Sequence, residues 1–149
     1  MLDVIGHGVG PAHTEVKVCQ GQVYIIETQL RIGGDQIWEM ALGTTGVDLV
    51  SETICAIAGL DRPPRKPKYT AMAIQFFSFA HSEVSAIVAP AELDDEPNLV
   101  RLQLNRQKLP WTGPARKSLD RLGYVLVNAQ TADLAQQQAK QLVGKLEFK

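Results

Sequence analysis

Two short strand-like runs near the start of the chain carry carboxylates where a strand interior is normally apolar. Residues 14–19 and 22–28 alternate in character, with Gln20-Gly21 as a turn between them, so they are expected to form a β-hairpin. Glu15 lies in the first run and Glu27 in the second. Because a buried, unpaired carboxylate costs several kcal/mol, these two acids restrict how the hairpin can pack and what it can bind.

The expected strand pairing brings the two carboxylates together. If the strands pair symmetrically about residues 20–22, paired positions sum to ~42, which places Glu15 opposite Glu27. Opposed carboxylates repel unless a cation such as Mg²⁺, shared with phosphate oxygens, lies between them. The strand pattern leaves a second interpretation open, a solvent-exposed face on which Glu15, Lys17 and Glu27 form ordinary surface pairs. Strict alternation also predicts a shared face for Val23, Ile25 and Glu27.

A charged loop and two helices are expected after the hairpin. Arg31 precedes Gly33, Gly34 and Asp35, and residues 36–46 are expected to be helical with Asp35 as the N-cap. A second helix is expected at about 47–58, ended by Gly59. Apolar stripes on both helices are expected to face a core, with members Ile37, Met40, Ala41, Val50, Ile54, Ile57 and Ala58.

Prolines divide the chain into two sections. Residues 61–68, DRPPRKPK, indicate an extended, solvated linker between a domain at 1–60 and a second domain at 69–149. The second domain is expected to be an antiparallel α+β unit. Its predicted strands are 69–80, 83–89, 99–104, 123–128 and 146–148, and its predicted helix is about 132–143, capped by Thr131.

Composition argues against several classes of partner. The formal charge of −1 gives no electrostatic indication of nucleic-acid binding. No apolar run approaches the ~18 residues of a membrane span, and the first residues lack the plan of a signal peptide. Cys19 and Cys55 have no metal-ligand spacing and are expected to be buried free thiols, which fits a reducing cytosol. We therefore expect a cytoplasmic protein without nucleic-acid or membrane partners, and a homodimer stays open.

The order of these residues resembles a known family. HTE at 13–15, then E-x-x-x-R-x-G-G-D at 27–35, a helix and G-V-D at 46–48 resemble the C-terminal half of an ATP-grasp domain, with the best match to the carboxylate–amine ligases. The resemblance is clearest over residues 6–60 and weaker over 69–148. It implies an α+β fold, in which the antiparallel sheet and helices of that half-domain are followed by a small antiparallel α+β subdomain.

The resemblance also implies roles for individual residues. Glu15 and Glu27 would bind Mg²⁺ or Mn²⁺, and Gln29, which stands where many members have a metal-binding Asn, would be a further ligand. Arg31 would contact the γ-phosphate of ATP and the acyl-phosphate formed from it. The loop beside the substrate carboxylate would comprise Gly33, Gly34 and Asp35, with His13 orienting Glu15 or facing substrate. Simpler structural roles stay open for these residues. The glycines could be needed only for a positive φ, Asp35 only as a helix cap and His13 only for packing.

The activity implied by the resemblance is ligation at the expense of ATP. ATP phosphorylates a carboxylic acid, and an amine then attacks the acyl-phosphate. The sequence has no GxxxxGK[ST] loop, and its abrupt start at Met1 is expected of a cut inside a larger protein, so the chain alone is expected to be inactive. A biotin-carboxylase-like or purine-biosynthetic member is the enzyme alternative. The alternative without enzyme activity is a non-catalytic binding or dimerisation module.

Overall fold

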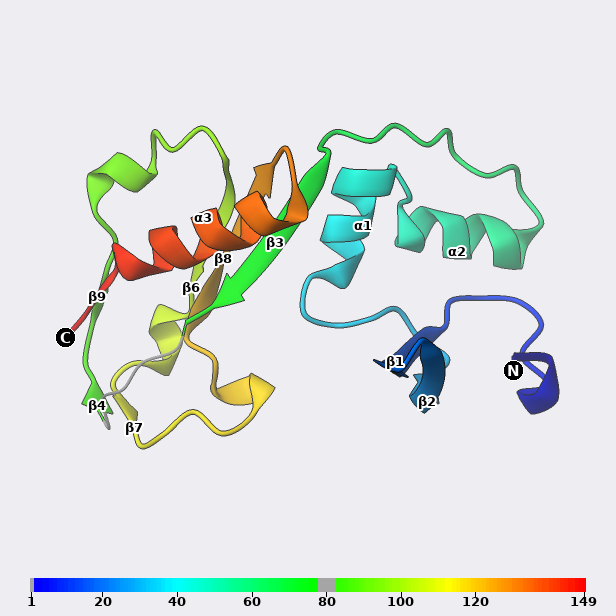
Figure 1. Ribbon diagram of the computed structural model, residues 1–149, viewed down its shortest axis with the longest axis horizontal. Helices are drawn as coiled ribbons and strands as arrows, with labels where there is room; N and C mark the ends of the chain where they lie inside the picture. The colour runs from blue at the N-terminus through cyan, green and yellow to red at the C-terminus, as the bar shows by residue number, and fades with distance from the viewer. Residues whose placement is uncertain (1, 78–82) are drawn as a thin grey trace. The chain divides into compact units, whose positions relative to one another are not determined.

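The structure, a computed structural model, describes residues 2–77 and 83–149. The chain divides into two compact units, Met1–Lys68 and Tyr69–Lys149. Both units combine helices or helical turns with antiparallel strands (Figure 1). The α+β class expected from the sequence is therefore confirmed.

A hairpin opens the first unit. After the 3₁₀ turn η1 (Leu2–Ile5), strands β1 (His13–Cys19) and β2 (Gln22–Gln29) pair antiparallel. The connecting residues Gln20 and Gly21 have φ of 51° and 76°. Left-handed values at both central residues are those of a type I′ turn, whose twist matches that of paired strands. The expected hairpin and its turn are confirmed.

Two helices follow, α1 (Ile37–Thr45) and α2 (Leu49–Ala58). Asp48 caps α2, because its carboxylate accepts the backbone N–H groups of Val50 and Ser51 at 3.0 and 3.1 Å and the Ser51 hydroxyl at 2.7 Å. The hydrogen bond from the Ser51 hydroxyl is the main cause of a lowered pKa at Asp48. As expected, α2 ends at Gly59, which has a φ of 67°.

The start of α1 differs from the expectation. Gln36, and not Asp35, occupies the N-cap position, with a φ of 62° and no side-chain capping hydrogen bond. Asp35 itself is left-handed, with a φ of 52°. Neither Gly33 nor Gly34 is among the positive-φ residues of the described chain. The capping role predicted for Asp35 is therefore wrong, and these two glycines do not serve positive φ.

Residues 61–68 return against the first unit's helices. The Arg65 guanidinium pairs with Glu52 of α2 at 3.0 Å. Gly46, between α1 and α2, has a φ of 72°, and a Cβ there would overlap the backbone of Lys66. The absence of a side chain at Gly46 is what lets this segment approach so closely.

The first unit leaves its apolar side chains accessible. Among its described residues the buried ones are all glycines, Gly33, Gly43 and Gly46. The α2 stripe predicted to be core is exposed, at 49% for Val50, 58% for Ile54 and 69% for Ile57. That prediction is wrong for this structure because periodicity identifies the apolar face of a helix and not what covers it.

The cysteine prediction is also corrected. Cys19 is exposed and Cys55 is partly buried, and both are free thiols. Cys19 is the last residue of β1 and pairs with Gln22 beside the turn, where a two-stranded hairpin offers no cover to a side chain.

The second unit is built on a three-stranded antiparallel sheet of order β3–β8–β6. Its strands are β3 (Ala71–Phe76), β8 (Gly123–Ala129) and β6 (Leu99–Leu104). Two short pairs join β4 (Glu83–Val84) to β7 (Trp111–Thr112) and β5 (Ile87–Val88) to β9 (Glu147–Phe148). The 3₁₀ turns are η2 (Ala91–Leu93), η3 (Arg106–Lys108) and η4 (Ser118–Asp120).

Most of the strands expected in this unit are confirmed. The run expected at 83–89 is divided into β4 and β5, and β7 was not expected. The expected strand at 69–80 corresponds to β3, and its last positions, 78–80, lie outside the described residues.

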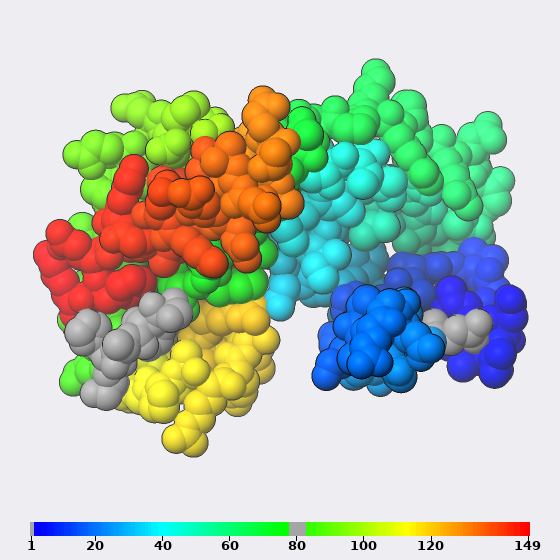
Figure 2. All heavy atoms as spheres, viewed as in Figure 1, coloured from blue at the N-terminus to red at the C-terminus, as the bar shows by residue number. Residues whose placement is uncertain are grey.

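Helix α3 (Ala132–Gly144) closes the second unit against β3 and β8 (Figure 1). Ala135, Ala139 and Leu142 lie on one helical face and are buried. In the space-filling view the orange and red atoms of α3 lie against green atoms of the same unit (Figure 2). The buried core comprises Phe77, Val84, Ile87, Leu93, Leu122, Val125, Val127, Ala135, Ala139, Leu142 and Leu146.

The N-cap of α3 supports a stability prediction. The Thr131 hydroxyl accepts the backbone N–H of Leu134 at 3.2 Å, as the sequence predicted. We expect Thr131→Ala to lower the free energy of unfolding by about 1 kcal/mol, since an N–H group of the first turn loses its partner. Urea unfolding followed by circular dichroism measures the change. Thr131→Ser retains the acceptor and is the control; equal midpoints for the alanine and serine variants would contradict the capping role.

In the described residues no single helix is long and apolar enough to cross a bilayer, whereas α1 and α2 together have that length and composition but are bent by 88° at their break.

Candidate functional site

One face of the hairpin gathers four of the predicted site residues. The Cα partners across the strands are Glu15 with Glu27 and His13 with Gln29. Since alternate residues of a strand share a face, these are two neighbouring pairs on the same side of the hairpin. The predicted opposition of Glu15 and Glu27 is confirmed.

The opposition of the two carboxylates depends on a β-bulge. Near the turn, Val16 pairs with Ile25, and the register shifts between Glu15 and Val16. Without that shift, Glu15 would face Ile26. Ile26 is instead the extra residue of β2, so Glu27 becomes the partner of Glu15. Bulges occur often beside functional sites, where they redirect a side chain.

The bulge also reverses the faces predicted for the earlier part of β2. Ile25 pairs with Val16, and Val23 with Val18, so both lie on the face opposite Glu27. We call these four residues the apolar face of the hairpin. The Thr14 and Thr28 hydroxyls also lie on this side, opposite the carboxylates, and at 2.7 Å from each other they join the two strands.

Polar contacts link the members of each strand. His13 Nε2 lies 3.5 Å from Glu15 Oε1, with the His13 side chain 20% exposed and that of Glu15 56% exposed. The Gln29 amide N–H₂ donates to Glu27 Oε1 at 3.0 Å. Its other atom, Gln29 Oε1, is buried and has no hydrogen-bond partner in the structure. An unpaired buried acceptor is costly, so a ligand that bound this oxygen would remove the cost.

The loop after β2 brings a cation and two glycines to the same end of the hairpin. Arg31 is exposed, and its Nη1 donates to the Ile32 carbonyl at 3.0 Å. A Cβ on Gly33 would lie 2.8 Å from His13 Nδ1 and 3.2 Å from Ile37 Cδ1. Gly33 is therefore required by the close approach of the His13 ring. Around Gly34 there is nothing within 4 Å of an added Cβ.

These neighbouring glycines give a matched pair of substitutions. We expect Gly33→Ala to displace the His13 ring, because real Cβ atoms essentially never approach a heavy atom to 2.8 Å, and to cost about 1 kcal/mol or more of stability. The imidazole resonances of His13 should shift in the NMR spectrum. Gly34→Ala meets no neighbour and should leave them unchanged. Identical spectra for the two variants would contradict the packing of Gly33 on His13.

The donor set of this face fits a hard divalent cation. In the described residues no three or more His, Cys, Asp or Glu side chains form a group that could hold a metal ion. Two carboxylates and one amide oxygen suit Mg²⁺, which commonly takes one or two protein carboxylates and completes its shell with phosphate oxygens and water. The exposure of Glu15 leaves room for such ligands.

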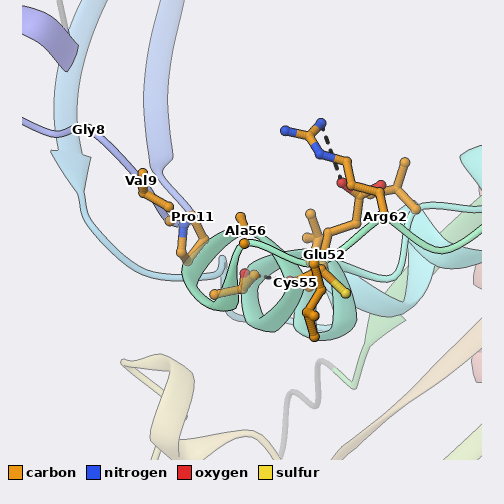
Figure 3. A pocket seen from close by; sticks show the side chains of 13 residues that line it. Gly8, Val9, Pro11, Glu52, Cys55, Ala56 and Arg62 are labelled. Carbon is orange, nitrogen blue, oxygen red and sulfur yellow. Dashed lines mark hydrogen bonds and ion pairs between the residues drawn. The ribbon is translucent and has the colours of Figure 1, made fainter.

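A separate pocket of about 540 Å³ lies in the first unit (Figure 3). It is formed by residues 8–11 and α2, with Cys55 and Ala56 in its lining and the Glu52–Arg62 ion pair, at 3.7 Å, at its edge. None of the sequence-predicted site residues lines it. The glycines of residues 6–10 were its one indication in the sequence.

Comparison with known proteins identifies the family. Residues 75–149 match the model of the family described as L-amino acid ligase C-terminal domain 2. The match covers half of the chain. The chain belongs to this family. No curated protein matches it by sequence.

Solved structures extend the similarity over the whole chain. The L-amino acid ligase from Bacillus licheniformis superposes with a TM-score of 0.74 at 18% identity, over 99% of this chain and 39% of that one. Phosphoribosylglycinamide synthetase from Anaerococcus prevotii superposes with a TM-score of 0.71 at 14% identity, over 99% of this chain and 39% of that one. N5-carboxyaminoimidazole ribonucleotide synthetase from Thermotoga maritima superposes with a TM-score of 0.68 at 16% identity, over 98% of this chain and 38% of that one.

These relatives are ATP-grasp ligases, so the fold is that of the C-terminal part of an ATP-grasp ligase, as expected. This member of the L-amino acid ligase C-terminal domain 2 family spans about two fifths of the length of the solved ligases that it resembles.

Proposed function

We propose that this chain acts as the C-terminal part of a longer ATP-dependent carboxylate–amine ligase. In this reaction ATP phosphorylates a carboxylic acid, and an amine displaces phosphate from the acyl-phosphate. The family match and the fold support the ligase class. We assign an amino acid as the acid substrate, because the matched family model is described as an L-amino acid ligase domain.

The observation that carries the proposal is the Glu15–Glu27 pair beside the unpaired oxygen of Gln29. These three side chains would hold Mg²⁺ or Mn²⁺. When bound, the cation would neutralise charge on the β- and γ-phosphates of ATP. His13, in contact with Glu15, would keep that carboxylate oriented towards the cation.

The loop beside this pair would handle the phosphoryl group and the acid. Arg31 has a planar, multi-donor guanidinium suited to phosphate oxygens, and we assign it to the γ-phosphate and to the acyl-phosphate. Gly33, Gly34 and Asp35 would lie beside the substrate carboxylate. Because catalysis of phosphoryl transfer consists mainly of positioning and charge stabilisation, this set needs no protein nucleophile.

The exposure of the first unit supports an intact protein larger than this chain. The apolar face of the hairpin is 50–66% exposed, and the α2 stripe is similarly uncovered. Exposed apolar surface of this kind usually marks an interface. We infer that a nucleotide-binding part of the ligase covers it, that the isolated chain does not turn over ATP, and that the intact ligase works in the cytosol, where ATP is available.

The test is amino-acid-dependent ADP release by the full-length protein that contains this chain. A panel of amino acids, alone and in pairs, is supplied with ATP and Mg²⁺. Release that depends on a particular amino acid supports the proposal. Release with a purine precursor and with no amino acid would favour a purine-biosynthetic ligase instead. If neither the amino acids nor the purine precursor gave substrate-dependent ADP release, the activity would be rejected and a non-catalytic binding or dimerisation module favoured.

A further inference from the structure

A cavity of about 540 Å³ in the second unit gathers positively charged side chains. It lies between the end of β3, including Phe76, and the loop at residues 114–121. Three of its lining residues are cationic, Arg116, Lys117 and Arg121, and none of the residues that line it is acidic. The chain as a whole carries a net charge of −1, so this local excess of positive charge does not follow from the overall composition.

The one carboxylate of this loop, that of Asp120, is hydrogen-bonded to the loop's own backbone. Asp120 Oδ2 accepts the backbone N–H groups of Arg116 and Lys117 at 2.9 and 3.1 Å. The hydrogen bond from Arg116 is the main cause of a lowered pKa at Asp120, and the charges of Lys117 and Lys108 contribute less. Asp120 is thus the one carboxylate of a loop that holds three cationic residues, and its hydrogen bonds fix the loop backbone.

Further hydrogen bonds hold the far end of the loop. Lys108 Nζ donates to the carbonyls of Leu119 and Arg121 at 2.6 and 3.1 Å. Asn105 donates its amide N–H to the same Arg121 carbonyl at 3.2 Å. The loop that presents the cations is therefore ordered before any ligand arrives, which reduces the entropy cost of binding.

Arg121 is positioned by an aromatic side chain. Its guanidinium carbon lies 3.7 Å from the centre of the Phe76 ring, and Phe76 in turn meets Tyr124 edge to face at 5.8 Å. This stacking fixes the position of one positive charge beside the cavity.

We propose that this cavity binds a small phosphate-bearing anion, through the guanidinium group of Arg116 and the ammonium group of Lys117, with Arg121 adding to the positive charge of the lining. Several positive charges in one lining suit a dianion, and a guanidinium group matches phosphate oxygens in geometry. The site belongs to the second unit alone and does not depend on the proposed ligase reaction.

The test is an NMR titration of the ¹⁵N-labelled 149-residue chain at constant ionic strength. Inorganic phosphate is the first probe, glycerol 3-phosphate the second and acetate the comparison anion. We expect saturable shifts at the amides of residues 114–121 with phosphate, with a dissociation constant on the order of 1 mM, and weaker shifts with acetate. Tighter binding of glycerol 3-phosphate would indicate a phosphate ester as the ligand, and tighter binding of inorganic phosphate would indicate the free ion.

Variants separate the site from general charge effects. Arg116→Gln should weaken phosphate binding about tenfold, the usual loss for one charge-assisted hydrogen bond. Lys117→Gln, also at an exposed position, is a second and independent variant. Arg106→Gln removes an exposed charge that does not line the cavity and should bind as the unmodified chain does. Linear, unsaturated shifts, equal affinities for Arg116→Gln and Arg106→Gln, or acetate binding as tightly as phosphate would each overturn the proposal.

Discussion

Replacing Gly123 by alanine should lower the free energy of unfolding of the second unit by about 3 kcal/mol or more. Gly123 begins the central strand β8 and is buried, with a φ of 153° that side chains rarely adopt. An added Cβ would overlap the Gln103 carbonyl on one side and the Phe77 ring on the other. Backbone strain and overpacking both oppose the substitution, and neither neighbour can leave without breaking the sheet or the core.

Thermal unfolding of the full chain measures the effect. We expect the midpoint of the second unit to fall by about 12–24 °C. Gly144→Ala, at the last residue of α3, is the matched control, because an added Cβ there has nothing within 4 Å and alanine favours a helix over glycine. A Gly123→Ala midpoint within a degree or two of the control would show that the strand accommodates the side chain.

Local pattern was enough to predict most elements of this chain. The turn at Gln20-Gly21, the end of α2 at Gly59 and the cap of α3 at Thr131 each depend on residues within a few positions of one another. The start of α1 was mispredicted because that prediction also used local residue preferences alone. Asp35 is a common N-cap residue, but the loop enters the helix through two left-handed residues, Asp35 and Gln36, and no propensity rule specifies that path.

Long-range contacts account for what sequence reasoning missed. With the two-residue turn alone, the residue numbers of each cross-strand pair would sum to 41, as those of Cys19 and Gln22 do. Glu15 would then not pair with Glu27. The bulge at Ile26 restores the predicted pair, so the prediction was right for a different geometric reason. Likewise Gly33 is explained by the His13 ring, twenty positions away in the sequence.

The cationic cavity was missed because its parts are dispersed along the chain. Arg116, Lys117 and Arg121 lie in one loop, whereas the Phe76 ring under Arg121 comes from β3. Neither segment carries a pattern that indicates a site by itself. By contrast, the candidate metal residues come from a hairpin whose members are close in sequence, and these were the residues that could be named in advance.

Glu27→Gln in the full-length ligase should reduce ATP-dependent acyl-phosphate formation about 100-fold or more. The substitution keeps the shape of the side chain and an oxygen that can accept the Gln29 amide, now 3.0 Å away, so the hairpin should be retained. What it removes is one of the two opposed carboxylates, and with it much of the attraction for a divalent cation. Loss of that charge stabilisation is worth several kcal/mol in the transition state of phosphoryl transfer.

Acyl-phosphate formation is measured by trapping with hydroxylamine, over a range of Mg²⁺ concentrations. If Glu27 holds the cation, half-maximal activity should require more Mg²⁺ in the variant, whereas a purely structural role would lower activity without changing that requirement. Glu92→Gln, at an exposed position of η2, is the control and should behave as the unmodified enzyme does. Near-normal turnover by Glu27→Gln would mean that the opposed carboxylates form only a charged surface pair, the interpretation that strand pattern alone left open.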